Sequence, residues 1–358
     1  MNFDTPFLKI IRSLLIPFSL LYGLIIRCRN WCYDKRIFES QEFQIPVICV
    51  GNLSVGGTGK TPMVEFLVRA FARDYKLAIV SRGYKRKTRG FLIADGVSTA
   101  TELGDEPMQF HQKFANITVV VGEKRAMAIN SLLSQRPETE LVLLDDAFQH
   151  RAVRAGLNIL LTDYQHLYTN DLLLPSGNLR DEKRSARRAD IIVVTKCPGH
   201  FSEKQRRDVY DQIKPTNNQP VFFTGIQYGT SYHLVKNSPL IHDPLAAVLL
   251  VTGIANPARL RAELTARHKE YHELVFPDHH AFTNSDIQNI KHRFAAIAGP
   301  KFILTTEKDA TRLKAYSQQL EDLPVYVIPI ESKFLFDDAE RFTEIITTFI
   351  QRYNRKQK

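Results

Sequence analysis

Short, continuously apolar runs alternate along most of the chain with stretches in which apolar residues recur every three or four positions. Such runs are typical of strands in a parallel sheet covered on both faces, and the periodic stretches predict the helices that cover it. The first set of predicted strands comprises residues 46–50, 77–80, 117–121, 141–144, 157–161 and 191–194. A second set comprises residues 246–252, 302–305 and 325–330. The pattern therefore predicts an α/β fold in two parts.

A segment rich in Asn, Pro, Gly and Thr, residues 215–232, separates the two sets of strands. The chain has 358 residues, which is more than one hydrophobic core usually accommodates. We therefore expect an N-terminal helix over residues 1–40, a first α/β domain over residues 41–220, and a smaller α/β domain with its linker over residues 221–358.

The N-terminal segment contains an uncharged run, residues 13–26, that is shorter than the about 20 residues needed to cross a bilayer as a helix. Thr5 and Pro6 are suited to begin a helix ahead of it. The run is flanked by the cations Lys9, Arg12, Arg27, Arg29, Lys35 and Arg36 and the aromatic residues Trp31 and Tyr33. This pattern predicts an amphipathic anchor helix lying in the plane of a membrane. The alternative is a helix packed on the core, because Pro17 and Gly23 weaken an isolated helix.

Composition adds a charge argument. The formal net charge of +10 and the pI near 9.3 indicate an anionic partner, such as a phosphorylated metabolite, an acidic membrane surface or nucleic acid. Nucleic acid is not expected, because the cations are not paired with stacking aromatic residues or a known reading element. The four cysteines form no CxxC pair, which fits a reducing compartment.

A glycine-rich segment, residues 51–62, follows the first predicted strand and precedes a helix expected from Met63. Several backbone N–H groups converge in such a loop, so it suits the phosphates of ATP. In this arrangement Lys60 reaches the β- and γ-phosphates and Thr61 offers its hydroxyl to Mg²⁺. A strict P-loop pattern has glycine where Ser54 stands. The expected ATP-binding residues are Ser54, Val55, Gly56, Gly57, Thr58, Gly59, Lys60 and Thr61.

Two acidic residues, Asp145 and Asp146, directly follow the predicted strand 141–144. A P-loop usually has an acidic residue at the end of a neighbouring strand near its Mg²⁺ ion. Adjacent residues of a strand point to opposite faces, so one of the two is expected near the metal, and the pattern leaves open which. The alternative is that the pair only caps the next turn.

Eight motifs in a fixed order allow a family to be named. They are residues 51–52 with 56–62, 81–84 (SRGY), 104–107 (GDEP), 144–150 (LDDAFQH), 174–180 (LPSGNLR), 253–257 (GIANP), 276–279 (FPDH) and 306–309 (TEKD). Together they closely resemble the tetraacyldisaccharide 4'-kinases of lipid A biosynthesis, over nearly the whole chain.

The resemblance implies transfer of the γ-phosphate of ATP to the 4'-hydroxyl of an acylated glucosamine disaccharide 1-phosphate, with Mg²⁺. It implies a peripheral or monotopic protein on the cytoplasmic face of the inner membrane of a Gram-negative bacterium, contacting the phospholipid surface through the N-terminal helix. The implied fold is a P-loop NTPase-type α/β/α kinase domain, residues 41–220, joined by a β-hairpin linker to a smaller α/β/α domain.

The resemblance also implies roles for particular residues. Asp105 is expected to be the catalytic base, assisted by His279 from the second domain, so that the two domains must close on one another. Residues expected near the metal are Thr61, Asp145, Asp146 and Gln149, and other residues expected to line the site are Arg82, Glu106, His150 and Arg180. Arg180 also opens a basic stretch, residues 180–188, that is either a phosphate-binding surface or a solvated helix face.

The chain departs from the family pattern at two places. Lys85 stands where glycine is common, and Asp181-Glu182 replaces a Glu-Pro pair, so no metal-proximal role is carried onto Asp181. A rival interpretation is a membrane-associated P-loop ATPase switch of the partitioning type. Those proteins need a lysine near the beginning of the loop, where Val55 stands here.

Overall fold

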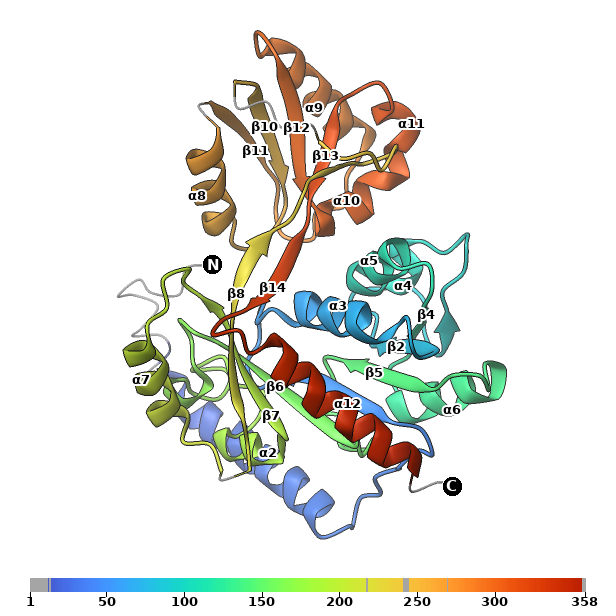
Figure 1. Ribbon diagram of the computed structural model, residues 1–358, viewed down its shortest axis with the longest axis vertical. Helices are drawn as coiled ribbons and strands as arrows, with labels where there is room; N and C mark the ends of the chain where they lie inside the picture. The colour runs from blue at the N-terminus through green and yellow to red at the C-terminus, as the bar shows by residue number, and fades with distance from the viewer. Residues whose placement is uncertain (1–11, 13, 217, 241–244, 269, 356–358) are drawn as a thin grey trace.

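The computed structural model describes residues 12, 14–216, 218–240, 245–268 and 270–355. They form two α/β parts that are joined by a narrow two-stranded ribbon (Figure 1). The expected helix start at Thr5 and Pro6 lies outside the described residues.

The larger part is built on a nine-stranded sheet of order β14-β8-β7-β6-β1-β5-β2-β4-β3, which is parallel except at β14 and β3. Its strands are β1 (Val47–Asn52), β2 (Leu77–Ser81), β3 (Leu92–Ile93), β4 (Thr118–Val121), β5 (Leu141–Asp145), β6 (Leu157–Asp163), β7 (Ile191–Cys197), β8 (Val221–Tyr228) and β14 (Ile330–Phe334).

Helices cover both faces of this sheet because successive strand residues point to opposite sides. In β1, Val47 and Cys49 pack in one core cluster, whereas Ile48 and Val50 pack in the other. One face is covered by α6 (Arg125–Gln135) and α7 (Glu203–Ile213) and the other by α3 (Lys60–Phe71), α5 (Asp105–Lys113) and α12 (Ala339–Arg355). Shorter helices are α4 (Ala100–Leu103), η1 (Tyr168–Asn170) and η2 (Lys183–Arg188).

The smaller part has a five-stranded sheet of order β11-β10-β12-β13-β9. Its elements are β9 (Tyr232–His233), β10 (Ala247–Thr252), α8 (Ala258–Arg267), β11 (Tyr271–Val275), α9 (Asn284–Ala296), β12 (Lys301–Thr306), α10 (Glu307–Leu313), η3 (Lys314–Tyr316), α11 (Ser317–Leu320) and β13 (Val325–Ile328). Helix α8 packs on one face of the sheet, and α9 and α10 pack on the other. The sheet is therefore a three-layered α/β/α unit, as expected.

The ribbon between the parts consists of β8 and β14, which pair antiparallel but are about 100 residues apart in sequence (Figure 1). The smaller part is thus inserted between these strands. Beyond β14, the chain returns to the larger sheet, where Phe342, Ile346 and Ile350 of α12 are fully buried. The structure differs here from the expected continuous smaller domain over residues 221–358, because the apolar stripe of α12 finds its partner surface on the larger sheet.

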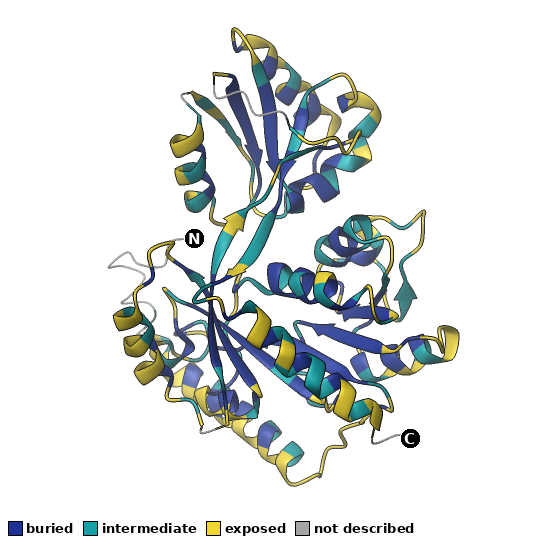
Figure 2. Cartoon of the chain, viewed as in Figure 1, coloured by how far each residue is buried: buried dark blue, intermediate teal, exposed yellow. Residues whose placement is uncertain are grey.

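Helix α2 (Ile16–Asp34) lies along the larger part and is mostly exposed (Figure 2). The face that meets the protein is formed by Ser19, Gly23, Ile26 and Asn30. Its large apolar side chains point outward instead, with Leu20 70% and Leu24 62% exposed. Within the described residues, no helix is both long enough and apolar enough to span a membrane.

Candidate active site

The glycine-rich loop connects β1 to α3, as expected, but α3 begins at Lys60, three residues before the expected start at Met63. Gly59 is the residue before the helix and has φ 79°, a left-handed conformation that favours glycine. The first turn of α3 therefore presents unpaired backbone N–H groups beside the Lys60 and Thr61 side chains. This is the arrangement that binds phosphate at a helix N-terminus.

The start of the expected ATP-binding segment has other partners. The Val55 N–H donates to the Asn178 carbonyl at 2.7 Å, and the Arg180 N–H donates to the Leu53 carbonyl at 2.7 Å. Ser54 forms a bridge with Leu179. In this conformation Val55 has no N–H free for phosphate, so the free amides of the loop begin after it.

Lys60 lies in a polar group with Asn52, Asp146 and Arg180. Its Nζ is 3.3 Å from Asn52 Oδ1 and 3.6 Å from Asp146 Oδ1. The Arg180 guanidinium donates to both carboxylate oxygens of Asp146, at 3.0 and 2.7 Å, and also to Asn52 Oδ1. Burial acts to raise the pKa of Asp146, but Lys60 and Arg180 outweigh it and hold that pKa well below its usual range. Asp146 is therefore a carboxylate that fixes two cations.

Asp145 ends β5 and is buried, and its Oδ2 accepts a hydrogen bond of 3.0 Å from the Ser81 hydroxyl. Burial, followed by the charges of Glu106 and Asp146, raises the pKa of Asp145 to about 7. The pKa values of these two adjacent acids are thus shifted in opposite directions. A cation beside Asp145 would favour its ionised form.

Gln149 and His150 lie on the turn after β5. The Gln149 side chain donates from Nε2 to the Asn52 carbonyl at 2.7 Å. The side-chain oxygen of Gln149 takes no part in this hydrogen bond. Burial, together with the charges of Arg125 and Arg82, lowers the pKa of His150 to about 4. His150 is therefore neutral near pH 7 and able to accept a hydrogen bond on one ring nitrogen.

Asp105 and His279, which come from the two different parts of the molecule, are in contact. Asp105 is the first residue of α5 and follows Gly104, which has φ 92° and whose Cβ, if present, would lie 3.0 Å from the Tyr84 carbonyl oxygen. His279 Nδ1 lies 2.9 Å from Asp105 Oδ2. The domain contact expected for this pair is present in the structure.

The tautomer of His279 follows from its second neighbour. Lys308 Nζ lies 3.1 Å from His279 Nε2. An ammonium group can only donate, so Nε2 accepts and Nδ1 carries the proton that is donated to Asp105. Burial acts to raise the pKa of Asp105, but the hydrogen bond from His279 and the charge of Arg312 outweigh it, so the pKa is lowered. Asp105 is therefore ionised and oriented through one oxygen.

These groups meet at one edge of the larger sheet. Strands β1, β5 and β2 are parallel neighbours, and the segments that follow them carry Lys60, Asp146 and Arg82. The carboxyl ends of parallel strands form the ligand crevice in open α/β sheets. Glu106, next to Asp105, is near enough to Asp145 for its charge to affect the pKa there. The expected base, metal and phosphate residues therefore lie in one region.

Four residues of this region had no role in the sequence interpretation, namely Asn52, Arg125, Lys308 and Arg312. Asn52 and Lys308 each lie within one of the eight motifs, and this was the sequence signal that could have identified them as site residues. Arg312 lies one helical turn after Lys308, and its Nε is 3.7 Å from Asp105 Oδ2. Nothing in its local sequence marks it.

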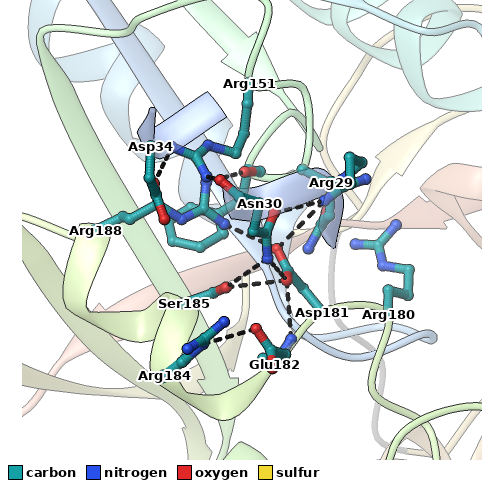
Figure 3. A network of polar contacts seen from close by, with 12 residues as sticks. Arg29, Asn30, Asp34, Arg151, Arg180, Asp181, Glu182, Arg184, Ser185 and Arg188 are labelled. Atoms are coloured by element: carbon teal, nitrogen blue, oxygen red, sulfur yellow. Dashed lines mark hydrogen bonds and ion pairs between the residues drawn. The ribbon is translucent and has the colours of Figure 1, made fainter. Parts of the chain in front are cut away.

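The segment after Arg180 is tied to α2 by a buried polar network (Figure 3). Asp181 is fully buried and accepts hydrogen bonds from Asn30 Nδ2 at 2.8 Å, from Ser185 Oγ at 2.9 Å and from Arg188 at 2.8 Å. Asp181 thus binds the helix rather than facing the phosphate loop. Three arginines of the basic stretch 180–188 are paired with carboxylates of the protein: Arg180 with Asp146, Arg184 with Glu182 and Arg188 with Asp181.

A loop suited to phosphate joins a buried strand to a helix, and acidic residues end the neighbouring strand of the sheet. This combination defines an α/β protein of the P-loop nucleotide-binding class. The model of the family described as tetraacyldisaccharide-1-P 4'-kinase matches residues 11–351. The chain belongs to this family.

Individual relatives agree with this membership. The tetraacyldisaccharide 4'-kinase of Flavobacterium johnsoniae is 45% identical over 345 residues, covering 96% of this chain and 98% of the relative. That of Bacteroides thetaiotaomicron is 42% identical over 367 residues, covering 98% and 96%. The crystal structure of LpxK from Aquifex aeolicus in complex with ATP is similar with a TM-score of 0.75 and 30% identity, covering 95% of this chain and 99% of that one.

Proposed function

We propose that the chain transfers the γ-phosphate of ATP to the 4'-hydroxyl of an acylated disaccharide 1-phosphate, as a step of lipid A biosynthesis. Family membership over residues 11–351 supports the reaction. The observation that carries the site is the contact between Asp105 and His279, at 2.9 Å. A partitioning-type ATPase is not favoured, because the family match extends over both α/β parts.

In this proposal Asp105 accepts the proton of the sugar hydroxyl. A sugar hydroxyl is a weak nucleophile near neutral pH, so its proton must be taken as the phosphoryl group is transferred. One oxygen of Asp105 is held by His279, and the other is left to meet the substrate. A carboxylate with a lowered pKa suffices, because alignment and charge neutralisation supply most of the catalysis in phosphoryl transfer.

Lys60 is proposed to bind the β- and γ-phosphates of ATP. Its present neighbours Asn52 and Asp146 hold its ammonium group at the mouth of the loop. Because Asp146 is held through both oxygens by Arg180, Lys60 can turn to the nucleotide without leaving Asp146 unpaired. Arg180 then serves as the structural partner of Asp146.

We also propose that Mg²⁺ binds here with ATP. Within the described part of the chain, no three His, Cys, Asp or Glu side chains are grouped to hold a metal. This fits Mg²⁺, which usually takes one or two protein oxygens together with substrate phosphates. The proposed donors are Thr61 and Asp145, with Gln149 nearby, because Asp146 is already paired to Arg180. When bound, the ion neutralises phosphate charge.

The exposed face of α2 supports a membrane location. It presents Phe18, Leu20, Leu21, Leu24 and Ile25 outward, all more than half exposed. A contiguous apolar surface of this kind marks an interaction site, and the neighbouring Arg27, Lys35 and Arg36 suit lipid phosphates. We propose peripheral binding to the cytoplasmic face of the inner membrane of a Gram-negative bacterium.

The test is mass spectrometry of products formed by the purified chain from Mg-ATP and a panel of hydroxyl acceptors in detergent. We expect one added phosphate on the tetraacylated disaccharide 1-phosphate. Lys60→Ala should lower the rate about 100-fold or more, as for other losses of a preorganised charge, whereas Lys204→Ala on the exposed side of α7 serves as the matched control. ATP hydrolysis that proceeds at full rate without any acceptor would contradict the kinase and favour the switch.

A further inference from the structure

Helix α10 of the smaller part packs against α5, the helix that begins with Asp105. Arg312 lies in the last turn of α10 and is largely buried, with 9% of its side chain exposed. Its Nε is 3.7 Å from Asp105 Oδ2, the carboxylate oxygen that also contacts His279. A second cation of the smaller part is therefore placed beside the oxygen of the proposed base that His279 already holds.

Arg312 also holds the turn that carries His279. Its Nη1 donates to the His280 carbonyl at 2.7 Å. His279 has φ 62°, a left-handed conformation that is unfavourable for a residue with a side chain. The His279 N–H donates to the Gly253 carbonyl at 3.3 Å. A residue keeps such a conformation only when its surroundings impose it, and Arg312 supplies one of the hydrogen bonds that do so here.

The guanidinium of Arg312 is fixed by Asp309, which is fully buried. Asp309 Oδ1 accepts a hydrogen bond of 2.8 Å from Arg312 Nη2. Asp309 Oδ2 accepts from the Gly253 N–H at 3.0 Å and from the Thr306 hydroxyl at 2.7 Å. The carboxylate is thus held on both sides, between the segment after β10 and the start of α10. Because the guanidinium is planar and rigid, holding one of its nitrogens orients the other two.

Arg312 is the one lysine or arginine that forms an ion pair with Asp105 in the part of the chain that the structure describes. Burial acts to raise the pKa of Asp105, whereas the hydrogen bond from His279 and the charge of Arg312 lower it. The other titratable groups around Asp105 and His279 are Glu106 on α5, Asp278 beside His279, Lys308 on α10 and Tyr84 on the loop after β2. The Lys308 ammonium group contacts His279 Nε2 and Asp278 Oδ1. Arg312 is therefore the cation whose removal changes the charge beside Asp105 most directly.

We propose that Arg312 is a positioning residue for the phosphoryl transfer, which aligns Asp105 with the turn of His279 and keeps the base ionised. This inference rests on the proposed function. Arg312 acts through Asp105, because its three nitrogens are directed to Asp105, the His280 carbonyl and Asp309. The smaller part thus contributes a second residue to the environment of the base, and Asp309 is the anchor of that residue.

The experiment measures kcat and KM for phosphorylation of the disaccharide 1-phosphate between about pH 5 and pH 9, in the full wild-type chain and in Arg312→Gln. Asp105 must be ionised to accept a proton, and a neighbouring arginine lowers a carboxyl pKa by about 1–3. The acidic limb of the kcat profile should therefore move to higher pH by about this amount in the variant. At pH 8, kcat should be about 10- to 100-fold lower, because the base is displaced. KM for ATP should stay within about twofold.

Two further variants test whether Arg312 acts through Asp105. In an Asp105→Asn chain, the added Arg312→Gln should lower kcat by less than about threefold, since the effects of residues that act as a unit are not additive. Arg312→Lys keeps the charge but not the planar fork. Its acidic limb should stay within about half a pH unit of the wild type, while kcat at pH 8 still falls. If Arg312→Gln does not fold, a wild-type kcat in Arg312→Lys overturns the inference.

Arg261→Gln is the matched control, because Arg261 likewise joins a helix of the smaller part to a neighbouring segment, through two hydrogen bonds of 2.8 Å to Glu273. It should leave kcat and the acidic limb unchanged. An acidic limb that does not move in Arg312→Gln, or an equal loss of kcat in the Asp105→Asn chain, overturns the inference and leaves the kinase intact. Absence of phosphate transfer by the wild type overturns the proposed function, and this inference with it.

Discussion

Three charged residues from three helices meet between the two parts of the molecule. Lys113 at the end of α5 lies 2.5 Å from Glu65 of α3 and also pairs with Glu307, the first residue of α10. Glu65 is 1% exposed, Glu307 is 5% exposed and Lys113 is 17% exposed. Helix α5 carries Asp105, the proposed base, and α10 carries Lys308. The cluster therefore connects α3, the helix that follows the phosphate loop, to the helices that carry these two residues.

Replacing Lys113 with Met leaves the buried Glu307 without its cation, whereas Glu65 keeps its ion pair with Arg69. Breaking a buried ion pair by removing one partner costs about 3–5 kcal/mol of stability. The cost should depend on pH, because burial and the charge of Glu65 already raise the pKa of Glu307 to about 7, and loss of Lys113 raises it further. The folded chain then keeps a proton that the unfolded chain releases above about pH 4.5, so stability falls as the pH rises through this range.

We therefore expect Lys113→Met to lower the free energy of unfolding by about 3–5 kcal/mol at pH 8 and by clearly less at pH 5.5, where Glu307 is protonated. Urea unfolding at both pH values measures this. Arg154→Met, which removes an exposed ion pair with Glu42, is the control and should cost no more than about 1 kcal/mol at either pH. Adding Glu307→Gln to Lys113→Met should recover part of the loss at pH 8. Equal destabilisation at the two pH values, or none beyond the control, would refute the reasoning.

Two further predictions concern the candidate site. Asp105→Asn should lower kcat about 100-fold or more while KM for ATP changes less than about twofold, because the base does not contact the nucleotide; normal turnover by steady-state kinetics would remove the base assignment. His150→Gln should lessen the loss of stability in acid, measured by urea unfolding from pH 6.5 to 4. In this range the unfolded wild-type chain gains a proton on His150 that the folded chain, with its pKa lowered to about 4, does not.

Most of the sheet could be predicted from sequence because buried parallel strands are continuously apolar. All nine expected strands are present, within a few residues of the expected bounds. The expected strand 325–330 is divided in the structure, because Pro329, which has no N–H, separates β13 from β14. Of the strands that were not expected, β11 and β14 are polar or partly exposed, and no alternation marks one buried face. Strand β8 is buried over its first half and lies within the segment that was interpreted as the boundary between the domains.

The candidate site likewise has a part that could be predicted from sequence and a part that could not. The phosphate loop is local, so its residue types and spacing were sufficient to predict its placement between β1 and α3. The environment of Asp105 is not local, because His279, Lys308 and Arg312 follow it by more than 170 residues and reach it only through the docking of the smaller part. The opposite pKa shifts of Asp145 and Asp146 likewise depend on Arg180 and Glu106, which no strand pattern places beside them.

The network of Figure 3 attaches helix α2 to Asp181, the residue after Arg180. Asn30 of α2 binds Asp181, and Tyr22 of the same helix donates to the Arg180 carbonyl at 2.9 Å. The Arg180 side chain in turn holds Asp146, which lies 3.6 Å from Lys60. The helix and the loop are thus both attached to one short segment, residues 180–181, the helix through hydrogen bonds and the loop through the partly buried Arg180–Asp146 ion pair. If α2 rests on the membrane as proposed, the phosphate loop keeps a fixed height and orientation above it, which a lipid acceptor anchored by its acyl chains requires.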